Sequence, residues 1–91
     1  MYQLKAIKEW IEIGKIDEAA QALDEYLQSD SKDKDEAYYL YGHIFRKRGD
    51  WQGALNSYRK AMDMNDKSPA VQAYRSILDI LNFYNKDMYN Q

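Results

Sequence analysis

The sequence predicts an all-α protein, folded as a right-handed stack of antiparallel helix hairpins. Apolar side chains recur at helical spacing in four separate segments of the chain. A pattern of residues that includes Gly14 is repeated around Gly49, at an offset of 35 residues. The 91 residues include one proline and four glycines, so little interrupts the helices except at short turns. Together these observations predict a single domain made of repeated helix pairs.

The first helix pair is predicted in residues 1–34, with helices at 2–13 and 16–28. In the second helix Ile16, Ala19, Leu23 and Leu27 fall on one face. The apolar residues of the first helix spread around more than one face. Gly14 is expected to end this helix, because glycine readily adopts the left-handed conformation found at helix C-termini.

The second pair is predicted in residues 35–68, with helices at 35–48 and 51–64. Gly49 should end the first of these helices, and Asp50 should cap the second. Asp33 and Glu36 have the spacing of a capping box. Each helix carries one apolar stripe, formed by Tyr38, Tyr41, Gly42 and Phe45 in the first and by Ala54, Leu55, Tyr58, Ala61 and Met62 in the second.

A closing helix is predicted at 69–84, followed by a frayed tail at 85–91. Ser68 and Pro69 provide a cap residue and a proline at the helix start. The stripe of this helix consists of Val71, Tyr74, Ile77, Leu78 and Leu81. Ile80 and Phe83 form a second apolar strip with no assigned partner, so we expect an interaction patch here, covered by the tail, by a client protein or by a second copy.

Residues 35–66 resemble the tetratricopeptide repeat family. The family pattern is an aromatic residue, Leu-Gly, an aromatic residue, a small residue, an aromatic residue and an alanine, found here as Tyr38, Gly42, Phe45, Ala54, Tyr58 and Ala61. The sequence departs from the pattern at Tyr41, where Leu is usual, and at Asp66, where Pro is usual. The resemblance implies two such repeats plus a capping helix. The ending from Asn82 to Gln91 resembles that of small stand-alone repeat proteins of Bacteroidetes-type bacteria.

The resemblance also implies a function. In this family the first helices of successive repeats line a concave groove that binds a peptide or a protein, so we expect an adaptor or scaffold. The corresponding positions here, outside the apolar stripes of the helix pairs, are Leu4, Lys8, Ile11, Tyr39, His43, Arg46, Gln72, Arg75 and Asp79. Tyr39 is either an amphipathic binding residue or simply a partly exposed tyrosine. The alternative function is a structural module that associates with itself through the C-terminal helix. For the oligomeric state we expect a monomer or a weak homo-oligomer.

Some family members clamp the C-terminal carboxylate of a chaperone with lysine, asparagine and arginine side chains. The corresponding positions in this sequence are Leu4, Lys8, Leu40, Gln72 and Ser76. Only Lys8 is cationic, and it stands where the family has asparagine. We therefore do not expect a carboxylate-clamp chaperone adaptor.

Other functional classes lack the residues that they need. The net charge of −2 and the short run Arg46-Lys47-Arg48 do not favour nucleic-acid binding. No apolar run is long enough to span a membrane, and no secretory signal is visible, so we expect a cytoplasmic protein. There is no cysteine, and His43 is the only histidine, so we expect no metal site, no cofactor and no enzymatic activity.

Overall fold

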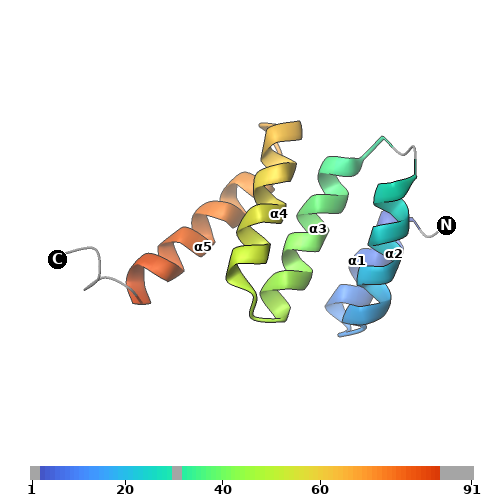
Figure 1. Cartoon of the computed structure of the whole chain (residues 1–91), viewed down its shortest axis with the longest axis horizontal. Coiled ribbons are helices and arrows are strands. Elements are labelled where there is room, and N and C mark those ends of the chain that lie inside the picture. The colour runs from blue at the N-terminus through green and yellow to red at the C-terminus, as the bar shows by residue number, and fades with distance from the viewer. Residues whose placement is uncertain (1–2, 30–31, 85–91) are drawn as a thin grey trace.

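The computed structural model of the chain describes residues 3–29 and 32–84, except for the side chains of residues 83 and 84. This part of the chain forms five helices and no strand: α1 (Leu4–Glu12), α2 (Ile16–Gln28), α3 (Lys34–Lys47), α4 (Trp51–Met64) and α5 (Ala70–Tyr84) (Figure 1). The all-α prediction is confirmed, and every helix boundary lies within two residues of its predicted position. No helix of the described part is long and apolar enough to cross a membrane.

The helices stack in chain order as antiparallel neighbours. α1 packs against α2, and α3 packs most extensively against α4. Both α1 and α2 also contact α3, whereas α5 packs mainly on α4. Figure 1 shows α3 and α4 side by side near the middle of the molecule, with α5 inclined away from them. α3 is therefore the central helix of the described part, because it contacts both helices of the α1–α2 pair and also α4.

Two glycines end α1 and α3 in the same way. Gly14 has a φ angle of 90° and Gly49 a φ angle of 79°. In each turn the glycine N–H bonds to the carbonyl three residues earlier, and the next N–H bonds to the carbonyl five residues earlier. The second of these bonds measures 2.8 Å after Gly14 and 2.9 Å after Gly49. This is the Schellman arrangement, and it confirms the predicted role of both glycines.

The predicted helix caps differ in outcome. The carboxylate of Asp50 accepts a hydrogen bond of 2.9 Å from the backbone N–H of Gly53, as expected for a cap of α4. The hydroxyl of Ser68 accepts one of 3.0 Å from the backbone of Ala70 at the start of α5. The capping box expected at the start of α3 is wrong, because Asp33 makes no side-chain cap bond. Its backbone, with φ −96° and ψ 49°, departs from the extended conformation that usually turns a capping side chain towards the first turn.

Two apolar clusters form the core. The first joins α1, α2 and α3 and contains Leu4, Ile7, Ile11, Ala19, Ala20, Ala22, Leu23, Ala37, Leu40 and Ile44. The second joins α4 and α5 and contains Ala54, Tyr58, Ala61, Ala70 and Ile77. Leu78, predicted to belong to the apolar stripe of α5, is 37% exposed, whereas the adjacent Ile77 is fully buried.

The seam between α3 and α4 is narrow because one of its residues has no side chain. A Cβ atom at Gly42 would overlap the aromatic ring of Tyr58, which is fully buried. Ala54 and Ala61 are also fully buried on α4. The glycine therefore leaves space for the tyrosine ring to cross the seam and to bring its hydroxyl group near the outer side of α3.

A candidate binding pocket between the first helices

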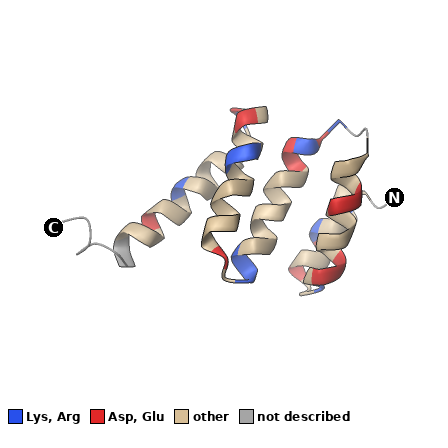
Figure 2. Cartoon of the chain, in the orientation of Figure 1, with Lys and Arg blue, Asp and Glu red and all other residues tan. Residues whose placement is uncertain are grey.

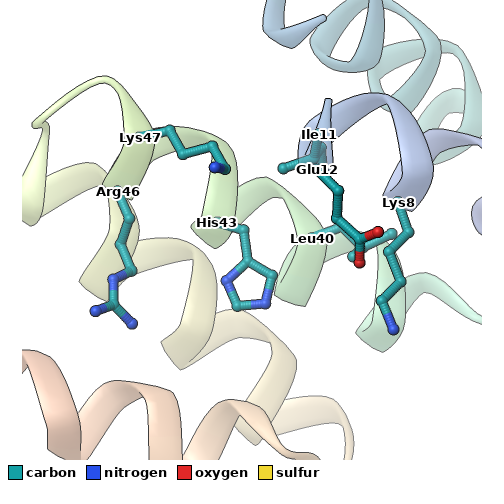
Figure 3. A pocket seen from close by; sticks show the side chains of 7 residues that line it. All are labelled: Lys8, Ile11, Glu12, Leu40, His43, Arg46 and Lys47. Atoms are coloured by element: carbon teal, nitrogen blue, oxygen red, sulfur yellow. The ribbon is translucent and has the colours of Figure 1, made fainter. Parts of the chain in front are cut away.

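A pocket of about 340 Å³ lies between α1 and α3, the first helices of the two pairs. Its lining comes from both helices: Lys8, Ile11 and Glu12 of α1, and Leu40, His43, Arg46 and Lys47 of α3 (Figure 3). Four of these seven residues, Lys8, Ile11, His43 and Arg46, were predicted as groove residues from the sequence. The helix pairing therefore brings together predicted residues that are far apart in the chain.

The pocket combines an apolar floor with a charged rim. Ile11 and Leu40 are 3% and 1% exposed, so only small parts of their side chains face the pocket. Lys8, Glu12 and Lys47 are exposed around it. An apolar base with a few polar groups at the edge is typical of sites that bind a ligand through shape and through a small number of directed contacts.

His43 has a fixed orientation because its ring is hydrogen-bonded to a buried hydroxyl group. The Nδ1 atom of His43 lies 2.6 Å from the Tyr58 hydroxyl oxygen. The positive charge of Arg46 acts on this hydroxyl group and lowers its pKa, against the larger effect of burial. Either the Tyr58 hydroxyl donates to Nδ1 or the Nδ1–H group donates to the hydroxyl oxygen, according to the tautomer of the ring. The neutral imidazole carries its proton on Nε2 in the first case and on Nδ1 in the second.

The surroundings of His43 favour this neutral form. Burial lowers the pKa of His43 below its ordinary value of 6.5, and the positive charges of Arg46, Lys8 and Lys47 lower it further. Burial raises the pKa of Tyr58 to about 12, although Arg46 opposes the shift. Both groups are therefore uncharged near pH 7. The pocket then contains a neutral imidazole beside three cations and one carboxylate.

The exposed cations of the pocket have no carboxylate partner in the described part of the chain. The ion pairs there are Arg48–Asp17, at 3.0 Å, and Arg59–Asp63, at 3.7 Å. Neither pair involves a residue that lines the pocket. The guanidinium of Arg46 lies instead over the ring of Trp51, 6.0 Å from its centroid.

The comparisons with known proteins agree with this architecture. Residues 35–68 match the Tetratricopeptide repeat family. The chain also matches the solution NMR structure of protein BF1650 of Bacteroides fragilis, with 60% sequence identity and a TM-score of 0.87. That match covers 100% of this chain and 92% of BF1650. The chain belongs to the tetratricopeptide repeat family. No match was found among the curated proteins.

Three predicted groove residues take part in packing, which the sequence did not indicate. Leu4 is 8% exposed and Ile11 is 3% exposed, and both belong to the first core cluster. Tyr39 packs against both core clusters, with its ring centroid 4.3 Å from that of His43 and 5.9 Å from that of Tyr58. The prediction that these three residues have no role in packing is therefore wrong. α1 needs two buried faces, because it contacts both α2 and α3.

The predicted groove residues on α5 lie apart from this pocket. Gln72 and Arg75 line a separate hollow of about 430 Å³ beside the loop that joins α4 to α5. Asp79 is exposed and lines neither hollow. Ile80 is partly exposed, but the side chain of Phe83 lies outside the described residues, so the C-terminal patch stays a prediction. Sedimentation equilibrium over a wide concentration range tests it, since self-association there requires a dimer at high concentration.

Three residues of the pocket were missed in the sequence. Glu12 lies four residues after Lys8, and Lys47 lies four residues after His43, so each shares a helix face with a predicted residue. This spacing is a signal that could have identified both. Leu40 was noted only as a clamp position, and its contribution to the floor depends on how closely α1 and α3 approach. In the described part of the chain no group of three or more His, Cys, Asp or Glu side chains could hold a metal ion.

Proposed function

We propose that this tetratricopeptide repeat protein binds a segment of a partner protein along the face formed by the first helices, α1, α3 and α5. The observation that carries the proposal is the pocket between α1 and α3, with its apolar floor and its lysines, which form no ion pair with any described residue. Tetratricopeptide repeats generally mediate protein–protein interactions, so the family supports the same type of ligand. The predicted groove residues on α5, which are Gln72, Arg75 and Asp79, are part of this proposal.

The pocket also explains why we propose binding and not catalysis. Its lining residues include no serine, threonine or cysteine that could act as a nucleophile. The Nδ1 atom of His43 is already engaged in a hydrogen bond with the Tyr58 hydroxyl group, at 2.6 Å. The family is typically a non-catalytic scaffold, in agreement with this arrangement.

A pull-down with charge-reversed variants tests the proposed face. Lys47→Glu changes an exposed residue that lines the pocket, and Arg59→Glu makes the same change in charge on the exposed side of α4. We expect specific partners in a bacterial lysate to be lost with Lys47→Glu and retained with Arg59→Glu. Circular dichroism should first show that both variants keep the helical spectrum.

A second measurement maps the contact directly. With the isolated partner added to isotope-labelled protein, the backbone amide signals of His43 and Lys47 should shift more than those of Asp17 and Glu18 on α2. If the largest shifts fall on α2 and α4, or if partners are lost only with Arg59→Glu, the first helices are not the binding face.

A further inference from the structure

We infer that a hollow between α1 and α2, at the end of the helix stack away from α5, binds an arginine side chain of a partner protein. The hollow has a volume of about 290 Å³ and is lined by Trp10, Glu18, Gln21, Ala22 and Glu25. None of these residues lines the pocket between α1 and α3, so the inference does not depend on the proposed groove. It follows from the indole ring and from the two glutamates beside it.

The four acidic residues of α2 fall on two faces of the helix. Asp17 and Asp24 are seven residues apart, and so are Glu18 and Glu25, and this spacing keeps two side chains on one face. Asp17 forms an ion pair of 3.0 Å with an arginine of α3. Burial raises the pKa of Tyr41 on α3, and the nearby Asp24 carboxylate raises it further. The two aspartates therefore face α3, whereas the two glutamates line the hollow (Figure 2).

The stability of α2 accounts for only one of these glutamates. Glu18 lies in the first turn, where a carboxylate complements the positive end of the helix dipole. Glu25 lies in the last turn, where a negative charge opposes the dipole, and that turn contains no basic residue. Neither glutamate forms an ion pair with any described residue. A cationic ligand would provide an ion-pair partner for both.

The second helix pair shows that packing does not require acids at these positions. At the offset of 35 residues, Glu18 corresponds to Gly53 and Glu25 to Lys60. A Cβ atom at Gly53 would lie 2.7 Å from the ring of Phe45, so in this pair the aromatic ring packs closely on α4. In the first pair a glutamate stands at that position, and a hollow lies beside the tryptophan. The two carboxylates are therefore additions to the repeated packing arrangement.

The lining of the hollow matches a guanidinium group. The face of an indole ring attracts a cation, and an ionised carboxylate only accepts hydrogen bonds. A guanidinium is planar, so it can stack on the ring of Trp10 while the N–H groups at its edge donate to the glutamates. Ala22 is 5% exposed and adds an apolar surface, which the aliphatic part of an arginine can contact.

Other cationic ligands fit the hollow less well. In the described part of the chain no group of three or more His, Cys, Asp or Glu side chains could hold a metal ion. Ligand pockets for small molecules usually measure about 300–1,000 Å³, so this hollow is at the lower limit and suits a single side chain. Arginine is also enriched at protein interfaces, where it stacks on aromatic rings.

Titration of the isotope-labelled full chain with a blocked tripeptide, Gly-Arg-Gly, tests the inference. The chain has two tryptophans, Trp10 and Trp51, so the indole N–H signal of Trp51 is an internal control. We expect a saturable shift of the Trp10 signal, larger than that of Trp51. The peptide with citrulline in place of arginine is neutral and has nearly the same shape, and it should cause no shift. The peptide with lysine should bind more weakly than the one with arginine.

Several results of this titration would overturn the inference. They are no shift with the arginine peptide, equal shifts of the two indole signals, equal effects of arginine and citrulline, or tighter binding of lysine than of arginine. Each of these results leaves the proposed function in place, because the pull-down with Lys47→Glu tests a different pair of helices.

Substitutions then locate the bound cation. Glu18→Gln and Glu25→Gln should each weaken binding of the arginine peptide about two- to fivefold, as expected for an exposed charge pair. Because Glu25 opposes the dipole of its helix, Glu25→Gln should not lower the thermal midpoint, so weaker binding would not result from unfolding. Glu36→Gln makes the same change in charge at an exposed position of α3 and should leave the affinity unchanged. Equal effects of Glu36→Gln and Glu25→Gln would show that net charge, and not this hollow, determines binding.

Discussion

Replacement of Gly42 by alanine should test the close contact between α3 and α4. A Cβ atom at this position overlaps Cδ1 and Cε1 of the Tyr58 ring and lies 2.8 Å from its Cζ, where ordinary contacts are 3.4–4 Å. The tyrosine has no exposed surface. The ring must therefore be displaced, and its hydrogen bond of 2.6 Å to His43 is displaced with it.

The expected loss of stability combines three contributions. Overpacking of a tight core costs about 1–3 kcal/mol, and three affected ring atoms place this site in the upper part of the range. The disturbed hydrogen bond adds about 1 kcal/mol, and the better helix propensity of alanine over glycine returns about 1 kcal/mol. We expect Gly42→Ala to lower the free energy of unfolding by about 2–3 kcal/mol. A domain of this length has a total of about 5–14 kcal/mol, so the variant should remain folded.

Urea denaturation followed by circular dichroism measures this change, and a double-mutant cycle assigns its cause. In a Tyr58→Leu background the ring is absent, so Gly42→Ala should be neutral or stabilising by up to about 1 kcal/mol. If the alanine costs the same in both backgrounds, or if it stabilises the wild-type chain, the ring of Tyr58 does not press on Gly42 and the account of the seam is wrong.

Three further predictions concern the helix ends and the histidine. Asp50→Ala should lower the free energy of unfolding by about 1 kcal/mol by removing the α4 cap, whereas Asp33→Ala should change it little; equal urea midpoints would contradict the cap assignment. Gly49→Ala should destabilise by about 1 kcal/mol through its positive φ alone, since no atom obstructs a Cβ there; an unchanged thermal midpoint would argue against it. The pKa of His43 is lowered on folding, so the unfolded chain binds more protons, and stability should fall as the pH decreases below about 6.5 towards the folded pKa. His43→Gln should reduce this part of the pH dependence, and an unchanged slope of stability against pH would show that His43 does not cause it.

The features that could be predicted from the sequence are those with a local cause. Gly14 and Gly49 identify two helix ends because a left-handed residue is needed there, whatever packs nearby. Gly42 and Ala54 identify the close seam because only small residues fit between two helices. The predicted cap at Asp33 was wrong, because residue type alone does not fix the backbone angles that direct a side chain.

The candidate site was harder to predict because it depends on how helices meet. Lys8 and His43 were found by their positions on the first helices, and both line the pocket. Tyr39 and Ile11 were expected to be free of packing, but periodicity along one helix cannot show that a second neighbour covers another face. The link from Tyr58 to His43 could not be seen in the sequence at all, because it joins residues 15 positions apart across a seam.

The helices differ in how many neighbours hold them, and this difference affects how a bound ligand would change the unfolding of the chain. α3 is held by three helices, whereas α5 is held mainly by α4, so the described chain is a short linear array with a well-anchored middle and a loosely anchored end. Local opening in such an array begins at the end element, which here carries Gln72 and Arg75. A ligand that touches both the α1–α3 pocket and α5 would tie this end to the middle, and part of its binding energy would appear as increased cooperativity of unfolding.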